Sequence, residues 1–155
     1  MSDGFGLPEP GRVHAIHVSP ARGLPMRPAE SVLLASGRGI PGDRYHQSRH
    51  RHVSVQALED LEAAADELGA PILPESTRRN ITITGTAVPS RPGDQLWIGG
   101  ARLEVVRIAA PCRLLDDEIG EGARVALRRR AGSILRVIGD GVVGMGDEVQ
   151  AAARP

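Results

Sequence analysis

Short strand-like segments separated by turn residues run through most of this chain, and they limit the folds open to it. Residues 80–84 alternate β-branched and polar side chains, a pattern typical of a half-buried strand. Residues 95–98 and 101–106 flank Gly99-Gly100, which is the spacing of a two-residue β-hairpin. Further strands are expected over 12–18, 31–34, 103–108, 134–138 and 148–150. We therefore predict a mainly β fold with a few helices (α+β), built as a partly closed β-barrel.

Two helices are expected beside these strands. Residues 52–55 are typical of a strand end that runs into a helix, and Ser54 is predicted to cap that helix. Its apolar residues recur at helical spacing on one face: Leu58, Leu61, Ala65 and Leu68. Gly69 and Pro71 are expected to end it. A short basic helix is predicted over 122–130, and its arginines form either a solvated face or a contact for phosphate or a partner protein.

The chain is predicted to hold one domain over residues 11–150. Its 155 residues are enough to bury a core of their own. Residues 1–10 are rich in glycine and proline and are expected to form a flexible lead, and residues 151–155 a frayed tail. In the first strand, Val13 and Ala15 would face one way and His14 and Ile16 the other, so the alternation is imperfect.

Charge and composition restrict the class of function. The formal net charge is zero, which argues against a dedicated nucleic-acid partner. All 19 basic residues are arginines, so no lysine can form a Schiff base, whereas phosphates and carboxylates can be bound in forked geometry. A single cysteine excludes an internal disulfide, and no apolar run has membrane-spanning length. A cytoplasmic protein without a membrane partner is therefore expected.

The single cysteine, Cys112, follows a strand-like run and stands in Ala110-Pro111-Cys112-Arg113-Leu114. A cation beside a thiol favours the thiolate, which is the form that reacts and binds metals. A lone cysteine can equally be a small buried hydrophobic residue. From the residues alone, Cys112 is thus either a reactive thiol at the mouth of a sheet or part of the core.

The order of five motifs resembles the MOSC domain family, named for the C-terminal part of molybdenum cofactor sulfurases. These motifs are Gly39-Ile40-Pro41-Gly42-Asp43-Arg44, Arg79-Asn80-Ile81-Thr82, Pro92-Gly93-Asp94-Gln95-Leu96-Trp97-Ile98-Gly99, the Pro111-Cys112 segment, and Gly144-Met145-Gly146-Asp147-Glu148-Val149. The resemblance covers residues 11–150 and is closest to the short, single-domain bacterial members. It implies a β-rich fold that binds the molybdenum cofactor (molybdopterin) or handles its sulfur.

In function, the resemblance implies an oxidoreductase, or a component of one, that reduces N-hydroxylated compounds with Cys112 as a thiolate ligand of molybdenum. It also leaves open a non-catalytic carrier of cofactor or sulfur that uses a Cys112 persulfide. The expected partners are a small-molecule substrate and either an external electron donor or a protein that donates cofactor or sulfur. Pyridoxal phosphate, associated with the sulfurases, would find no lysine here to bind it covalently.

Several polar residues near these motifs are candidates for the cofactor site. Arg78 and Arg79 would clamp a phosphate, although they also suit a solvated loop. Asn80 would bond a pterin edge or a neighbouring turn, and Asp43 would orient Arg44 and His46 or form an Asx turn. Arg113 would hold a phosphate, lower the pKa of the Cys112 thiol or join a surface ion pair.

The spacing His46-x-x-x-His50-x-His52 admits a zinc site. No second cluster of ligands accompanies it, so exposed histidines on a polar loop are the alternative that the sequence favours. His46 alone is kept as a cofactor-site candidate, because it closes the Gly-Asp-Arg-x-His segment.

Overall fold

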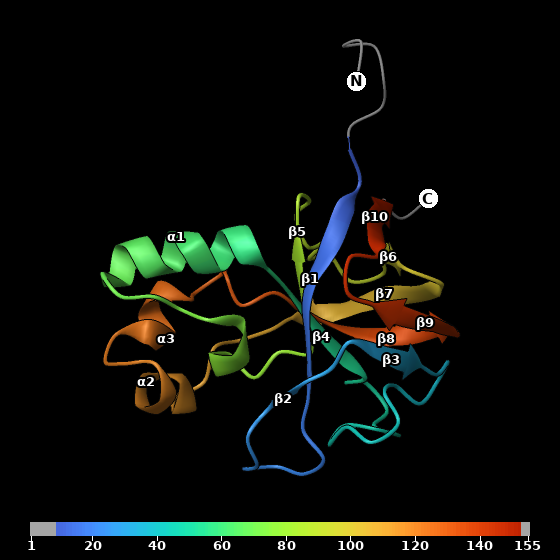
Figure 1. Cartoon of the computed structure of the whole chain (residues 1–155), viewed down its shortest axis with the longest axis horizontal. Helices are drawn as coiled ribbons and strands as arrows, with labels where there is room; N and C mark the ends of the chain where they lie inside the picture. The colour runs from blue at the N-terminus through green and yellow to red at the C-terminus, as the bar shows by residue number, and fades with distance from the viewer. Residues whose placement is uncertain (1–8, 153–155) are drawn as a thin grey trace.

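Seven strands close into a β-barrel in the computed structural model, which describes residues 9–152 (Figure 1). The strands are β1 (Gly11–Val18), β2 (Arg27–Pro28), β3 (Ser31–Leu34), β4 (Val53–Ala57), β5 (Ile81–Thr84), β6 (Gln95–Ile98), β7 (Ala101–Ile108), β8 (Ser133–Gly139), β9 (Gly141–Gly144) and β10 (Glu148–Ala152). The helices are α1 (Leu58–Leu68), the 3₁₀ turn η1 (Pro74–Ser76), α2 (Leu114–Glu118) and α3 (Ala123–Ala126).

The barrel follows the order β10-β6-β7-β8-β4-β5-β1 and closes where β1 pairs with β10, with Gly11 opposite Val149. Six of its seven pairings are antiparallel, and only β4 and β5 run parallel, joined by the crossover through α1. β2 extends the sheet beyond β1, whereas β3 and β9 form a separate two-stranded sheet. The predicted mainly β barrel is confirmed, and it is closed.

Aliphatic side chains fill the barrel, since the chain has one Phe, one Tyr and one Trp. Every residue of β4 is buried, and the strands around it send inward Ile16, Ile81, Leu103 and Leu135. Burial of each such side chain contributes about 1.5–3 kcal/mol. The predicted hairpin of β6 and β7 is confirmed, since Ile98 pairs with Ala101 across Gly99-Gly100.

The helix α1 begins later than the sequence suggested. Ser54 does not cap it, because Ser54 lies inside β4, and the residue before the helix, Ala57, makes no side-chain cap bond. The helix buries Leu61 and Ala64, and Gly69 ends it in the left-handed conformation at φ 78°. The strand expected over 52–55 is present, but it continues through Gln56 to Ala57, where the helix was expected.

A second apolar cluster lies beside the barrel, among the three helices. Its buried members come from α1, α2, α3 and nearby segments: Leu61, Ala64, Ile72, Leu115, Ala126 and Leu127. The short helix α2 was not predicted, and α3 covers only 123–126 of the expected 122–130. The helix α3 packs against α1, and α2 packs against α3, in keeping with their shared cluster (Figure 1).

Two strands differ from expectation, β1 in its pairing and β10 in its length. In β1 the pairing with β5 shifts between Val13 and Ala15, and this bulge buries both Val13 and Ile16 in spite of the imperfect alternation. The strand β10 continues to Ala152, which pairs with Gln95, so the first two residues of the expected frayed tail belong to the sheet. Residues 1–8 of the expected lead and 153–155 of the tail lie outside the described residues.

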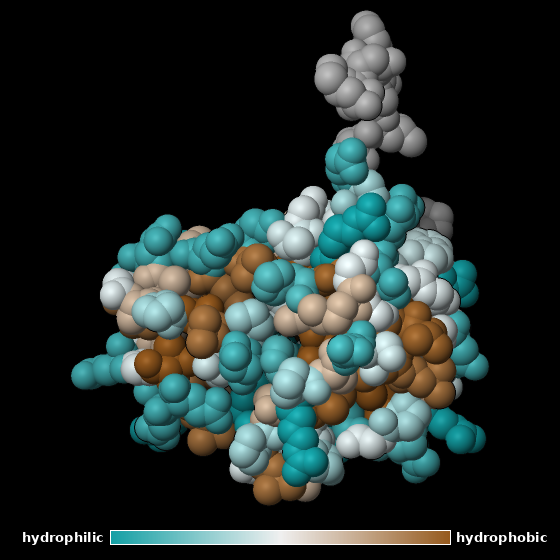
Figure 2. All heavy atoms as spheres, in the orientation of Figure 1, coloured by the Kyte–Doolittle hydropathy of each residue, from teal (hydrophilic) through white to brown (hydrophobic). Residues whose placement is uncertain are grey.

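Apolar surface gathers over the two-stranded sheet of β3 and β9, at the right of Figure 2. Leu33 and Val142 face each other across this sheet and are about half exposed. Among residues 9–152, no helix is long and apolar enough to cross a membrane.

Candidate functional site

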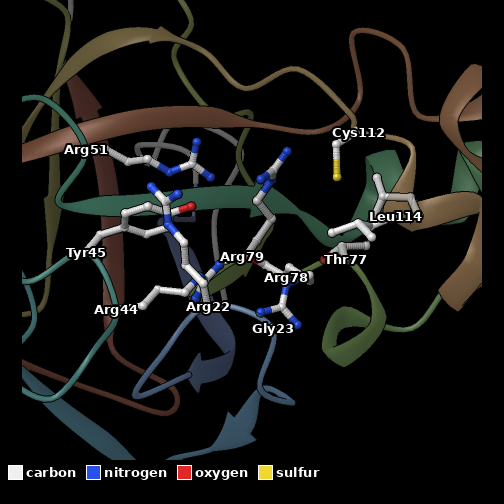
Figure 3. Close-up of a pocket in the computed structure, with 11 residues that line it drawn as sticks. Arg22, Gly23, Arg44, Tyr45, Arg51, Thr77, Arg78, Arg79, Cys112 and Leu114 are labelled. Atoms are coloured by element: carbon white, nitrogen blue, oxygen red, sulfur yellow. Dashed lines mark hydrogen bonds between the residues drawn. The ribbon is translucent and has the colours of Figure 1, made fainter.

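A cavity of about 280 Å³ opens where the barrel meets the helical cluster. Four segments far apart in sequence line it: the β1–β2 loop, the β3–β4 loop, the stretch before β5 and the β7–α2 connection. Its lining is Arg22, Gly23, Arg44, Tyr45, Arg51, Thr77, Arg78, Arg79, Cys112, Leu114 and Leu115. Figure 3 shows the arginines and Tyr45 on one side, Cys112 and Leu114 on the other, and Arg79 between them.

Cys112 is exposed and lies just beyond β7, as the sequence predicted. The alternative that it belongs to the core is therefore wrong. The chain around it is fixed on both sides, because the Ala109 amide donates to the Gly132 carbonyl at 2.9 Å and Leu115 is buried in the helical cluster. The thiol thus lies at the edge of the cavity, on a segment that is anchored on both sides.

Arg79 is 6% exposed, and its guanidinium donates to two backbone carbonyls. Nε reaches the Ala131 oxygen at 3.0 Å, and one Nη reaches the Ala110 oxygen at 3.2 Å. Burial lowers the pKa of Arg79 to about 10, nearby cations including Arg51 add to the fall, and Cys112 opposes it. At neutral pH the group stays charged, so Arg79 presents a positioned cation beside the thiol.

Arg78 lines the cavity with its backbone in the left-handed region, at φ 62°. This conformation is uncommon for a residue with a side chain and costs about 1–2 kcal/mol. The Arg78 carbonyl accepts a hydrogen bond from Arg44 at 3.0 Å, while its guanidinium donates to the Leu24 carbonyl and lies 3.7 Å from a Glu118 oxygen. Arg78 therefore has a carboxylate partner, whereas its neighbour Arg79 has none among residues 9–152.

Asp43 forms an Asx turn and also contacts Arg44, one of the two residues that it was expected to orient. One carboxylate oxygen accepts from the Tyr45 amide at 3.3 Å, as in an Asx turn, and the other lies 3.5 Å from the Arg44 guanidinium. That second oxygen also accepts from the Ser19 amide at 3.1 Å. The buried carboxylate thereby holds the β3–β4 loop, and with it Arg44, against the barrel.

Three guanidiniums surround the ring of Tyr45. The guanidinium carbons of Arg51, Arg44 and Arg22 lie 4.3, 4.7 and 5.9 Å from the ring centre. Arg22, Arg51 and Tyr45 were not predicted as site residues. The only sequence clue was the position of Tyr45, the one tyrosine, directly after the Gly-Asp-Arg motif.

Asn80 does not line the cavity. It is 1% exposed, and its side-chain oxygen accepts from both the amide and the hydroxyl of Ser54 at 3.0 and 3.1 Å. Its amide nitrogen donates to the His17 carbonyl and to Asp43 at 3.1 and 3.3 Å. Asn80 thus ties β1, β4 and β5 to the loop that carries Arg44, and it presents no free edge to a ligand.

Arg113 and His46 also lie outside the cavity lining. Arg113 is exposed, and no carboxylate of residues 9–152 lies within 4.0 Å of it. Among the same residues, no group of three or more His, Cys, Asp and Glu side chains is placed to hold a metal ion. The three histidines of the His-x-x-x-His-x-His run therefore form no such group.

His52 is buried, contrary to the expectation of exposed histidines on this loop. Its Nδ1 accepts a hydrogen bond from the Val137 amide at 2.9 Å, which requires the neutral ring. Burial lowers the pKa of His52 below its ordinary 6.5. His50 on the same loop is exposed.

We expect the stability of the protein to fall as the pH is lowered from 6.5, partly because of His52. The unfolded chain binds a proton at this residue more readily than the folded chain does, so the free energy of unfolding decreases as the pH drops through this range. His17, whose pKa burial also lowers, adds to the same trend. In urea unfolding between pH 5 and 7.5, His52→Asn should flatten the slope and His50→Asn should leave it unchanged. An unchanged slope in His52→Asn would contradict the assignment.

The expected basic helix contributes exposed surface. Arg124, Arg128 and Arg129 are exposed, and Arg130 lies 3.3 Å from the Glu67 carboxylate of α1. None of these residues lines the cavity that holds Cys112.

Comparison with solved structures shows the same fold in proteins from three bacteria. YuaD from Bacillus subtilis superposes with a TM-score of 0.84 at 17% identity, over 95% of this chain and 98% of that one. YiiM from Geobacillus stearothermophilus gives 0.73 at 17% identity, over 92% and 75% of the two chains. YiiM from Escherichia coli gives 0.66 at 19% identity, over 93% and 71%. No functionally curated protein matches the sequence.

The family model of the MOSC domain matches residues 42–150. This range holds β4 to β9 in full, the start of β10, and every cavity residue except Arg22 and Gly23. The motifs around Asn80, Asp94 and Cys112 lie inside it, and the match begins at Gly42, within the motif that contains Asp43. The chain therefore belongs to the MOSC domain family, which is associated with the molybdenum cofactor.

Proposed function

We propose that this protein binds the molybdenum cofactor in the arginine-lined cavity, with the Cys112 thiolate as a ligand of the metal. The observation that carries the proposal is that one cavity contains both the single exposed thiol and five arginines. A soft thiolate is a suitable ligand for such a metal, and guanidiniums are suitable donors to a phosphate ester.

The residues present fit a metal that arrives inside an organic cofactor. Residues 9–152 contain no cluster that could hold a bare ion, so Cys112 would complete a coordination that the cofactor itself largely supplies. Arg79 would hold the phosphate of the cofactor, because it is positioned by two carbonyls and lies close enough to Cys112 to feel its charge. Arg44 would assist it, and Asp43 and Asn80 act as positioning residues through the loop that bears Arg44.

The reaction that we propose is the reduction of an N-hydroxylated small molecule. When bound, the cofactor supplies two-electron redox chemistry at its metal. The chain's own residues would orient the cofactor and the substrate, and the Tyr45 hydroxyl is the one phenolic group of the lining that can donate a hydrogen bond to a substrate atom. One cysteine cannot build an iron–sulfur cluster, so electrons would come from an external donor in the cytoplasm.

The metal content of the purified protein tests this proposal. Protein from a host that makes the cofactor is analysed for molybdenum by mass spectrometry as wild type, Cys112→Ala and Met145→Ala. We expect about one molybdenum per wild-type chain and a loss of tenfold or more in Cys112→Ala. Met145→Ala removes another exposed sulfur, outside the cavity lining, and should keep the wild-type content.

Absence of molybdenum from the wild type would overturn the proposal. A mass increase of one sulfur atom on Cys112 would then identify the persulfide carrier instead. For loaded protein, turnover of an N-hydroxylated compound with a chemical electron donor separates an enzyme from a carrier, because a carrier shows no turnover.

A further inference from the structure

The cavity contains more positive charge than one phosphate group needs. Arginine supplies 19 of the 155 residues but 5 of the 11 that line this cavity. Two of the five are matched by carboxylates, Arg44 by Asp43 and Arg78 by Glu118. Arg22, Arg51 and Arg79 have no carboxylate within 4.0 Å among residues 9–152.

Holding these arginines close together without carboxylate partners destabilises the fold. Burial lowers the pKa of Arg51, and the nearby charges of Arg44, Arg107 and Arg22 lower it further, while Tyr45 opposes the shift. The Arg51 Nε is buried and has no hydrogen-bond partner in the described part of the chain. An unsatisfied buried donor costs about 1–3 kcal/mol. A bound anion would satisfy this donor and offset the repulsion among the guanidiniums.

The cations fall into two groups within one cavity. Arg79 lies toward Cys112, whereas Arg22 and Arg51 flank Tyr45, as Figure 3 shows. Arg51 lies close enough to Arg79 for its charge to contribute to the lowered pKa of Arg79. A single phosphate at Arg79 would leave the Tyr45 group without an anion, while two linked phosphates would serve both groups.

We propose that Arg22 and Arg51, on either side of Tyr45, form a second phosphate subsite, so that with Arg79 the cavity binds a diphosphate group. The proposal rests on the proposed function, in which the first phosphate is that of the cofactor held by Arg79. A cavity of about 280 Å³ lies at the small end of ligand pockets, so it would hold the diphosphate while the attached organic group extends toward the rim. The diphosphate could belong to a dinucleotide form of the cofactor or to a nucleoside diphosphate substrate.

Calorimetric titration of protein purified without the cofactor tests the subsite directly. The probes are inorganic pyrophosphate and inorganic phosphate at equal ionic strength. We expect pyrophosphate to bind at least tenfold more tightly than phosphate to the wild type. Arg51→Met and Arg22→Met should each weaken pyrophosphate binding at least tenfold and change phosphate binding less. Arg22 is exposed, so its variant folds even if Arg51→Met does not.

Two further variants show whether pyrophosphate binds at this subsite and whether its binding depends on Cys112. Arg128→Met removes an exposed arginine outside the cavity and should not change pyrophosphate binding. Cys112→Ala should also bind pyrophosphate normally, so failure of the molybdenum test and failure of this test are distinct results. Equal affinity for the two anions, or equal losses in Arg51→Met and Arg128→Met, would overturn the proposal.

The source of the diphosphate is decided on molybdenum-loaded protein. Acid hydrolysis that releases one nucleotide per molybdenum would assign the diphosphate to the cofactor. No released nucleotide, together with Arg51-dependent binding of a nucleoside diphosphate to the loaded protein, would assign it to the substrate. If neither result is obtained, the diphosphate subsite is disproved.

Discussion

Replacing Gly132 with alanine is expected to destabilise the protein by more than about 4 kcal/mol, or to prevent folding. Gly132 adopts φ 82°, and an added Cβ would overlap the Val55 carbonyl oxygen of β4. The opposing atoms belong to the backbone of a fully buried strand, so no side chain can move aside. The free energy of unfolding in urea measures the effect.

Gly37→Ala is the matched control, because Gly37 has a similar φ of 73° but open space where the Cβ would lie. It should cost only about 1–2 kcal/mol, the penalty of the left-handed conformation alone. If the two variants were equally stable, overlap with the Val55 carbonyl would not be the cause of the stability loss in Gly132→Ala.

The effect of Gly132→Ala should reach the cavity as well. The Gly132 carbonyl accepts the hydrogen bond of Ala109, and the carbonyl of the preceding Ala131 holds Arg79. A displaced 131–132 segment would therefore move both Arg79 and the chain that leads to Cys112. If the variant folds, it should also bind less molybdenum than Gly37→Ala.

Asn80→Asp is expected to lower the free energy of unfolding by about 3–5 kcal/mol at pH 7, the second largest effect. The change removes the amide that donates to the His17 carbonyl and to Asp43, and it places a second carboxylate beside the buried Asp43. Lowering the pH protonates a carboxyl group and relieves the repulsion, so the difference from wild type should shrink between pH 7 and pH 4. Urea unfolding at several pH values measures this trend.

Gln150→Glu makes the same exchange of amide for carboxylate on an exposed side chain of β10. Its free energy of unfolding should stay within about 0.5 kcal/mol of the wild type at every pH. A loss below about 1 kcal/mol in Asn80→Asp, or a loss independent of pH, would show that the Asn80 network is not what holds these strands.

The sequence predicted the parts of this fold that rest on local patterns. The hairpin at Gly99-Gly100, the strand after Asn80 and the helix end at Gly69 follow from turn chemistry and periodicity, and each is present. The continuation of β4 to Ala57 was missed because Ser54 and Gln56 are buried polar residues whose partners, Asn80 and Thr82, lie just before β5 and within it. Pairings between distant segments decide that strand, and a single sequence does not reveal them.

The sequence likewise predicted only part of the candidate site. Arg44, Arg78, Arg79 and Cys112 line the cavity, as their motifs suggested. Asn80 and Asp43 do not line the cavity but hold the loop that carries Arg44. Arg113 and His46 lie outside the lining. Arg22 and Arg51 were missed because neither belongs to one of the five motifs, and only the folded barrel brings them to Tyr45. The role of Gly132 likewise depends on the close approach of β4.

The pairing of β1 with β10 has a consequence for how the protein behaves at high concentration. An open sheet presents a row of unpaired amides and carbonyls at each outer strand, and such edges recruit strands from other molecules. In this barrel, the strands that would form those edges bond to each other, with Arg12 opposite Glu148. The seven-stranded barrel thereby leaves only the two-residue strand β2 at the edge of the main sheet, and it limits growth into intermolecular β-structure without relying on surface charge.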